Sequence, residues 1–234
     1  HTLAPSKKIK VVLADYQIRY SRIKTMADTE EKEDRNTHMA DVIERYISTS
    51  ADSRHCLFLV GCGHASKTDI PGSASTPSGM TPALTAGAQL ARRLGDDNVF
   101  SVMQHNISTD NSGRYSSKPR GGMFDRAFEL NGNRPIGFKL KGSPFGNEPY
   151  DGMYEIKYDH RAGTYADNFD GFLFLHPLDN EPHNTPLMEV FSQSFIDEMK
   201  RRAEVLEFND RKWIWFGTMA DEMTIESIAK ALGE

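Results

Sequence analysis

The sequence predicts an α/β fold with a mostly parallel central sheet, helices on both faces and long loops at the carboxyl edge of the sheet. Three observations predict it. Short apolar runs are continuous rather than alternating, as in strands that are covered on both faces. Amphipathic helical patterns lie between these runs, and strand–helix alternation is typical of parallel sheets. Two long stretches rich in Gly, Ser and Pro interrupt the alternation.

The apolar runs give the expected strands. They are followed, in most cases, by glycine or polar residues, which mark the end of a strand. The predicted strands cover residues 9–14, 56–60, 99–103, 172–175 and 213–216.

Helices are predicted from apolar residues that recur with helical spacing. We expect the first to begin near Asp28, because a glutamate three residues later would complete a capping box. The second has Thr81 as N-cap, Pro82 in its first turn and Gly95 just past its end. Thr224 is the expected cap of the last helix. The predicted helices cover residues 28–47, 82–94, 188–206 and 225–232.

Residues 63–80 and about 106–170 read as irregular, with short strands expected only near 136–140 and 154–158. Loops of this length are uncommon in compact domains unless they serve a site. The length of 234 residues fits one α/β domain over residues 1–234 that carries a long irregular insertion at about 106–170.

Composition excludes several classes of protein. With 28 basic and 33 acidic residues the net charge is -5, so nucleic acid is not an expected partner. No apolar run approaches the ~18 residues of a membrane span. Cys56 and Cys62 lie in one apolar run, where a strand would hold them ~20 Å apart, too far for a disulfide. Two free thiols favour a cytoplasmic location. Because the chain starts at His1 without a signal peptide, we expect part of a larger polypeptide.

Polar residues follow four of the expected strands, at the edge where ligands bind in parallel sheets. Asp15 and Tyr16 follow the first strand, residues 61–64 (GCGH) the second, His105 the third and His176 the fourth. The alternative interpretation is that loops are polar because they face solvent.

The GCGH turn carries the clearest chemical signal. Gly61 and Gly63 would let the backbone approach a ligand closely. His64 would then project into the crevice as a base or a metal ligand. Lys67 follows, but the turn has neither a dinucleotide-binding fingerprint nor a P-loop ending. A nucleophilic Cys62 is a further alternative, although the Cys and His of such dyads come from separate segments.

Arg35 and Asn36 adjoin the buried face of the first helix, one turn before Met39. An inward-pointing arginine needs an anionic partner. The alternative is a solvated arginine in a charged run. Residues 158–160 (Tyr-Asp-His) form another, weaker candidate for a metal site.

These pieces occur in a characteristic order. The sequence RNTHMA at 35–40 is followed by an amphipathic helix, the strand CLFLV, GCGH, a Gly/Pro-rich loop, a helix and the strand NVFSV. Residues from about 30 to 105 therefore resemble the later half of the erythromycin-esterase-like/ChaN/TIKI superfamily. The phrase FDGF that begins at Phe169 resembles the start of the final core strand of that family, up to about residue 178.

The resemblance implies an α/β fold with a polar crevice, in proteins that hydrolyse esters or peptides or that bind haem or metal. It implies that His64 is the crevice histidine of the second family motif and that Arg35 lies beside it. Asn36 stands where many relatives have aspartate. The earlier family motif, with its own histidine, is not found in this chain, so Asp15, His105 and His176 are the local candidates to replace that histidine.

Two functions follow, with a small-molecule or peptide substrate or ligand as the partner. In a hydrolase of esters or amides, His64 would activate water or hold a divalent metal, Arg35 would bind an anionic group, and Asp15 or His105 would orient the base. In a non-catalytic binding protein, His64, His105 and Tyr16 would ligate haem or metal. A third possibility is a glycan- or polyketide-related domain. The expected ligand-binding residues are Tyr16, Asn36, Gly61, Gly63, Lys67 and His176.

Overall fold

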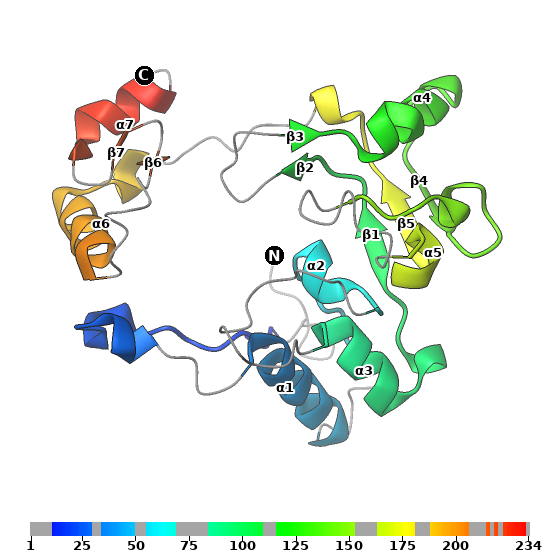
Figure 1. The fold of residues 1–234 in the computed structure, drawn as a ribbon, viewed down its shortest axis with the longest axis horizontal. Coiled ribbons are helices and arrows are strands. Elements are labelled where there is room, and N and C mark those ends of the chain that lie inside the picture. The colour runs from blue at the N-terminus through cyan, green and yellow to red at the C-terminus, as the bar shows by residue number, and fades with distance from the viewer. Residues whose placement is uncertain are drawn as a thin grey trace, which may run out of the picture. The chain divides into compact units, whose positions relative to one another are not determined.

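The computed structural model describes residues 11–29, 34–49, 55–68, 84–109, 116–152, 163–180, 188–205, 214–215, 218–219 and 222–232. The chain divides into two compact units, drawn in Figure 1. The first unit comprises residues 1–16 and 33–181, and the second comprises residues 17–32 and 182–234. The prediction of a single domain stays a prediction.

The first unit holds a small mixed sheet with the order β1-β5-β4. β1 (Val102–Gln104) pairs in parallel with β5 (Gly171–Phe174), and β4 (Ile136–Lys139) pairs with the other edge of β5 in the antiparallel sense. The α/β class is therefore confirmed. A mostly parallel sheet is not confirmed, because one of the two strand pairings is antiparallel.

Three of the predicted strands do not join this sheet. Residues 11–14 and 56–60 are described and contain no strand, and the side chains of Leu13 and Leu57 are 86% and 83% exposed. The last predicted strand is present as β6 (Ile214–Trp215), which pairs antiparallel with β7 (Thr218–Met219) in the second unit. An apolar run predicts burial, but a strand also needs a neighbouring backbone that accepts its hydrogen bonds. β2 (Ser108–Thr109) and β3 (Ser116–Ser117) form a further antiparallel pair.

An aromatic core covers one face of the sheet. α4 (Met123–Leu130) and α5 (Tyr165–Asn168) contribute to it, and neither helix is predicted from the sequence. Its buried members are Met103, Phe124, Phe128, Leu140, Tyr150, Tyr165, Phe169, Phe172 and Phe174. On the other face Val102 is 47% exposed. Helices on both faces are therefore not confirmed by the described residues.

Residues 62–64 of the GCGH turn lie in α2 (Cys62–Ala65), which is close to α1 (Arg35–Thr49) and α3 (Ala86–Leu94). α1 begins later than predicted because Asp34, rather than Asp28, accepts the first-turn N–H of Thr37, at 2.9 Å. Asp28 instead accepts the backbone N–H groups of a preceding turn. α3 is capped by Thr85 and ends at Gly95, which has a φ of 92°. The predicted cap, Thr81, lies outside the described residues.

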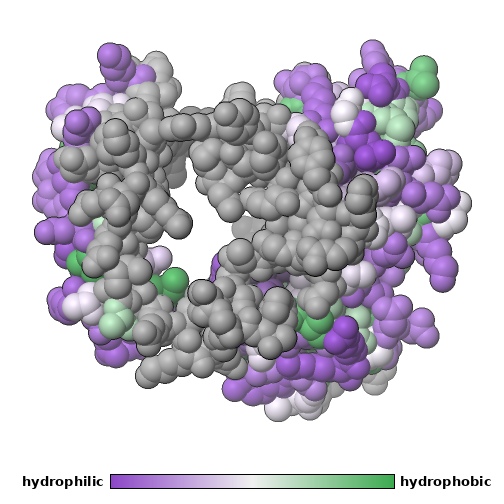
Figure 2. Space-filling view, in the orientation of Figure 1, coloured by the Kyte–Doolittle hydropathy of each residue, from purple (hydrophilic) through white to green (hydrophobic). Residues whose placement is uncertain are grey.

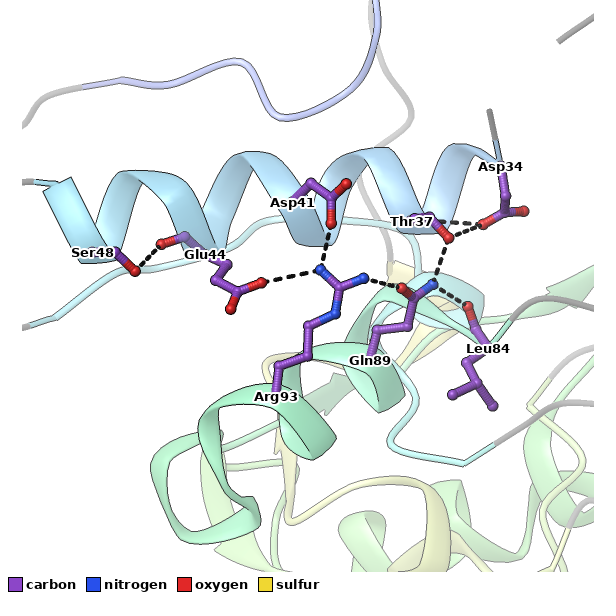
Figure 3. A network of polar contacts seen from close by, with 8 residues as sticks. All are labelled: Asp34, Thr37, Asp41, Glu44, Ser48, Leu84, Gln89 and Arg93. Atoms are coloured by element: carbon purple, nitrogen blue, oxygen red, sulfur yellow. Dashed lines mark hydrogen bonds and ion pairs between the residues drawn. The ribbon is translucent and has the colours of Figure 1, made fainter. Parts of the chain in front are cut away.

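A polar network joins α1 to α3 (Figure 3). Arg93 on α3 pairs with Asp41 and with Glu44, the latter at 3.1 Å, and donates to Gln89 Oε1 at 2.7 Å. Gln89 Nε2 in turn donates to Thr37 Oγ1 at 3.1 Å. Gln89 is 8% exposed, so these hydrogen bonds satisfy a buried amide and fix one helix against the other.

Short 3₁₀ turns connect the larger elements of the first unit. They are η4 (Asp96–Asn98), η5 (Pro119–Gly122), η6 (Phe145–Asn147) and η9 (Leu178–Asn180).

The second unit packs around Ile196, Met223 and Ile228. Its helices are α6 (Gln193–Val205) and α7 (Ile225–Leu232), with short turns η2 (Tyr20–Arg22), η3 (Met26–Thr29) and η10 (Met188–Val190). The Ser227 N–H donates to Thr224 Oγ1 at 3.0 Å, which confirms the predicted cap of α7.

The described surface is mostly hydrophilic in the view of Figure 2, where hydrophobic residues form separate patches. Within the described ranges, none of the helices has the length and apolarity needed to cross a membrane.

Candidate functional site

His64 lies on α2 and contacts the start of α1. Its Nδ1 is 2.7 Å from Asn36 Oδ1. The same oxygen accepts the backbone N–H of Ala86, the first residue of α3, at 3.1 Å. Asn36 is 3% exposed, so three helices meet at one buried side-chain amide. The sequence predicts Asn36 as a ligand-binding residue, whereas its described contacts are with His64 and Ala86.

Arg35 and Asp15 form an ion pair beside this contact. Arg35 Nε donates to the two Asp15 carboxylate oxygens at 3.0 and 2.9 Å, and its Nη2 also pairs with Asp15. Both side chains are 42% exposed. The hydrogen bond from Arg35 lowers the pKa of Asp15, which keeps this carboxylate ionised at neutral pH. Arg35 therefore has an anionic partner in Asp15, although the pair is partly exposed to solvent.

The surroundings of His64 favour its neutral form. Burial lowers the pKa of the imidazole, and the positive charge of Arg35 lowers it further, while Asp15 and Asp34 act in the opposite direction. A neutral imidazole can accept a proton or ligate a metal ion, and an imidazolium can do neither. The side chain is half-buried, so it is held in place and still reaches the surface.

Close packing of α2 against α3 positions His64. A Cβ built on Gly87 would lie 2.4 Å from the carbonyl oxygen of Ala65 and 2.5 Å from that of Ser66. Thr85 Oγ1 donates to the Ser66 carbonyl at 2.6 Å while it accepts the Ala88 N–H. Glycine at position 87 therefore lets the end of α2 touch α3 directly.

The two glycines of the GCGH turn have ordinary backbone conformations, and their predicted role in ligand binding stays a prediction. Gly61 precedes α2, and its carbonyl accepts the His64 N–H at 2.9 Å. A Cβ on Gly61 would lie 3.8 Å from His64 Cδ2, which is an ordinary contact. Neither Gly61 nor Gly63 has a positive φ. The turn is thus closed by helical geometry.

Lys67 is engaged in contacts within the first unit. Its Nζ lies 3.1 Å from both Asp170 carboxylate oxygens, 3.1 Å from the Val99 carbonyl oxygen and 2.6 Å from Asp96 Oδ1. The side chain is 8% exposed. Its described partners are therefore groups of the protein that join the end of α2 to the loops around β1 and β5.

His105 lies in the aromatic core. Its ring contacts Phe128, Phe172 and Phe174, with centroids 5.5, 5.8 and 5.6 Å away. His105 Nε2 is 3.3 Å from Asp125 Oδ1, and the histidine side chain is 1% exposed. The rule that polar residues at strand ends face a crevice does not hold for this residue.

Tyr16 and His176 have other neighbours. The ring of Tyr16 meets the edge of His38 at 5.4 Å between centroids, next to Asp15 in the chain. His176 Nδ1 lies 3.1 Å from the carbonyl oxygen of Pro177. In the part of the chain that the structure describes, no three His, Cys, Asp or Glu side chains form a group able to hold a metal ion. The candidate at 158–160 lies outside the described residues.

A buried cluster next to α2 is not predicted from the sequence. Tyr165 Oη donates to Asp151 Oδ1 at 2.8 Å, and the Arg120 backbone N–H donates to Asp151 Oδ2 at 2.9 Å. Burial raises the pKa of the Cys62 thiol near Tyr150, so Cys62 is not a thiolate at neutral pH. This finding weakens the alternative of a cysteine nucleophile. Aromatic residues and aspartates scattered through an irregular stretch give no periodic signal for such a cluster.

Comparison with protein-family models, with curated proteins and with solved structures gave no match.

Proposed function

We propose that the first unit is a hydrolase domain of the erythromycin-esterase/ChaN/TIKI type, in which His64 activates water to attack an ester or amide. The observation that supports the proposal is the local geometry of His64. One ring nitrogen is held by Asn36 at 2.7 Å, the imidazole is half-buried, and the Arg35–Asp15 pair lies nearby. A general base needs a neutral, oriented imidazole with its second nitrogen directed to the substrate.

Arg35 supplies positive charge beside the base. An arginine near the reacting carbonyl would stabilise the oxyanion that develops when hydroxide adds to it. Asp15 holds the guanidinium through Nε and Nη2, so in this proposal Asp15 positions Arg35 and not His64. The described donors do not form a metal-binding group, and the proposed reaction uses no step through a metal ion.

The test compares His64→Ala with His55→Ala on a panel of esters and amides. His55 is an exposed histidine of the first unit, which makes it a matched control. We expect turnover of at least one substrate class by the wild-type protein, a loss of ~10²-fold or more in His64→Ala, and no change in His55→Ala. Equal turnover by His64→Ala and the wild-type protein would exclude His64 as the base. Absence of turnover across the panel would reject the hydrolase.

The same geometry supports a second function, the binding of haem or another small ligand. Histidines that ligate metals commonly hold their second nitrogen in a hydrogen bond, as His64 does with Asn36. Addition of haem should then give a Soret band, and this signal should be lost in His64→Ala. A signal that His64→Ala retains would assign the ligand to another site.

A further inference from the structure

The orientation of the Asn36 amide is fixed by a backbone group. The Ala86 N–H can only donate, and it points at the Asn36 side-chain atom 3.1 Å away. That atom must therefore be the carbonyl oxygen, because an amide nitrogen there would place two donors against each other. Ala86 is buried at the first position of α3, where a backbone N–H has no partner within its own helix.

The protonation of His64 follows from this orientation. Its Nδ1 lies 2.7 Å from the same Asn36 oxygen, which can only accept. Nδ1 must therefore carry the proton. In the neutral imidazole the lone pair is then on Nε2, because one ring nitrogen is a donor and the other an acceptor.

We propose that Asn36 is a positioning residue, whose Oδ1 fixes the Nδ1–H tautomer of His64 and makes Nε2 the proton acceptor. The two carbonyl lone pairs are shared between the helix terminus and the histidine. Packing of α1 on α3 through the Arg93 and Gln89 network holds that oxygen in place. The lowered pKa of His64 agrees with a neutral ring at physiological pH.

The catalytic meaning of this assignment rests on the proposed hydrolase. Nε2 accepts a proton from water, and the oxygen of the resulting hydroxide forms a bond to the carbonyl carbon of the substrate. The imidazolium keeps its Nδ1–H hydrogen bond to Asn36 throughout, and this bond strengthens when the ring is charged. The imidazolium then returns the Nε2 proton to the leaving group as the bond from the carbonyl carbon to that group breaks.

The tautomer can be measured without turnover, by long-range ¹H–¹⁵N correlation of protein with ¹⁵N-labelled histidine. In the wild-type protein near neutral pH we expect a protonated Nδ1 and an unprotonated Nε2. Asn36→Ala should change this pattern to the Nε2–H form or to a mixture. Asn36→Asp keeps the acceptor, so it should retain Nδ1–H and raise the pKa of His64 by ~1–3 units through its negative charge.

Thr85→Ala is the matched control. It removes the side-chain cap of α3 and the bond to Ser66 but leaves Asn36 in place, so a merely structural effect would appear in it as well. We expect its His64 signals to stay as in the wild-type protein. An Nε2–H tautomer in the wild-type protein, or an unchanged Nδ1–H signature in Asn36→Ala, would overturn the assignment. If Asn36→Ala does not fold, the spectra of the wild-type protein and of Asn36→Asp still show which nitrogen of His64 carries the proton.

Kinetics separate this assignment from the proposed function. If the hydrolase is correct, Asn36→Ala should lower kcat on the order of 10- to 100-fold with little change in KM, as for other residues that orient a functional histidine. The predicted tautomer together with an absence of turnover would reject the hydrolase and leave the role of Asn36 intact. Turnover with the opposite tautomer would reject the role of Asn36 alone.

Discussion

Replacement of Lys67 by methionine tests whether this residue is part of the scaffold or of a ligand site. Methionine keeps the unbranched stem and removes the ammonium group. The substitution leaves the Asp170 carboxylate without the cation that lies 3.1 Å from both of its oxygens. It also leaves the Val99 carbonyl without the donor at 3.1 Å. Asp170 retains one hydrogen bond, from the Ser101 N–H at 2.8 Å.

The expected loss of unfolding free energy follows from these contacts. Removing one member of a fully buried ion pair costs ~3–5 kcal/mol. The Lys67 side chain is 8% exposed, but Asp170 is 29% and Asp96 76% exposed, so water can replace part of what is lost. We therefore expect Lys67→Met to lower the unfolding free energy by ~2–3 kcal/mol.

Urea unfolding followed by far-UV circular dichroism measures this loss. Lys118→Met is the control, because Lys118 pairs with Asp179 at 2.7 Å with side chains 36% and 76% exposed. It should cost no more than ~1 kcal/mol. A double-mutant cycle with Asp170→Asn should show a coupling of ~1 kcal/mol or more between Lys67 and Asp170. If Lys67→Met loses as little unfolding free energy as the control, the structural role of Lys67 is refuted. If Lys67→Met changes only the affinity for a ligand, Lys67 is a binding residue.

Three further substitutions test packing and charge. Gly87→Ala should destabilise the protein by ~1–3 kcal/mol, because the alanine Cβ would lie 2.4 and 2.5 Å from backbone carbonyl oxygens. This loss is expected although alanine favours helices, and a rise in the urea midpoint would contradict the packing. Leu57→Ala should change the unfolding free energy by no more than ~0.5 kcal/mol, since Leu57 is 83% exposed; a loss above ~2 kcal/mol would instead indicate the doubly covered strand that the sequence predicts. Hydrogen bonds from Arg201 and a neighbouring arginine lower the pKa of Glu198 from 4.5 to about 2, so its contribution to stability is complete above the unfolded pKa and is lost as the pH falls toward about 2. Glu198→Gln should make the urea midpoint less dependent on pH in that window, and an unchanged pH dependence would exclude the ion pair.

The sequence predicts His64, Arg35, Asp15 and His105 as a catalytic group, with Asn36 as a ligand-binding residue. Helical periodicity places Arg35 and Asn36 next to the buried face of α1. The rule that sites form at the carboxyl ends of strands directs attention to Asp15 and His64. In the structure Asp15 contacts Arg35, and His64 contacts the adjacent Asn36, although 11–14 and 56–60 contain no strand. The sequence pattern does not show which side chains bind each other, namely Asp15 with Arg35 and Asn36 with His64.

Other features depend on contacts that a local pattern does not contain. His105 follows an apolar run, but the sequence does not show whether its ring turns toward solvent or toward the phenylalanines around it. The sequence predicts Asp28 as the cap of α1, whereas in the structure Asp34 accepts the N–H of Thr37. α4 does carry a signal, because Phe124 and Phe128 are four residues apart and both are buried, yet the surrounding glycines predict irregular structure.

The order of the strands sets the order in which the first unit can assemble. β5 lies at the centre of the sheet, but it is the last of the three strands to be synthesised. β1 and β4 therefore leave the ribosome without a sheet partner. The hydrogen bonds that join the β1 and β5 regions include that of Ser101 with Asp170, residues that lie 69 positions apart. Long-range pairing of this kind slows folding. Until its partner is made, each strand exposes unpaired backbone N–H and C=O groups. The sheet can close only once residue 174 has been made, so a nascent chain halted before β5 carries two unpaired strands that another chain could capture.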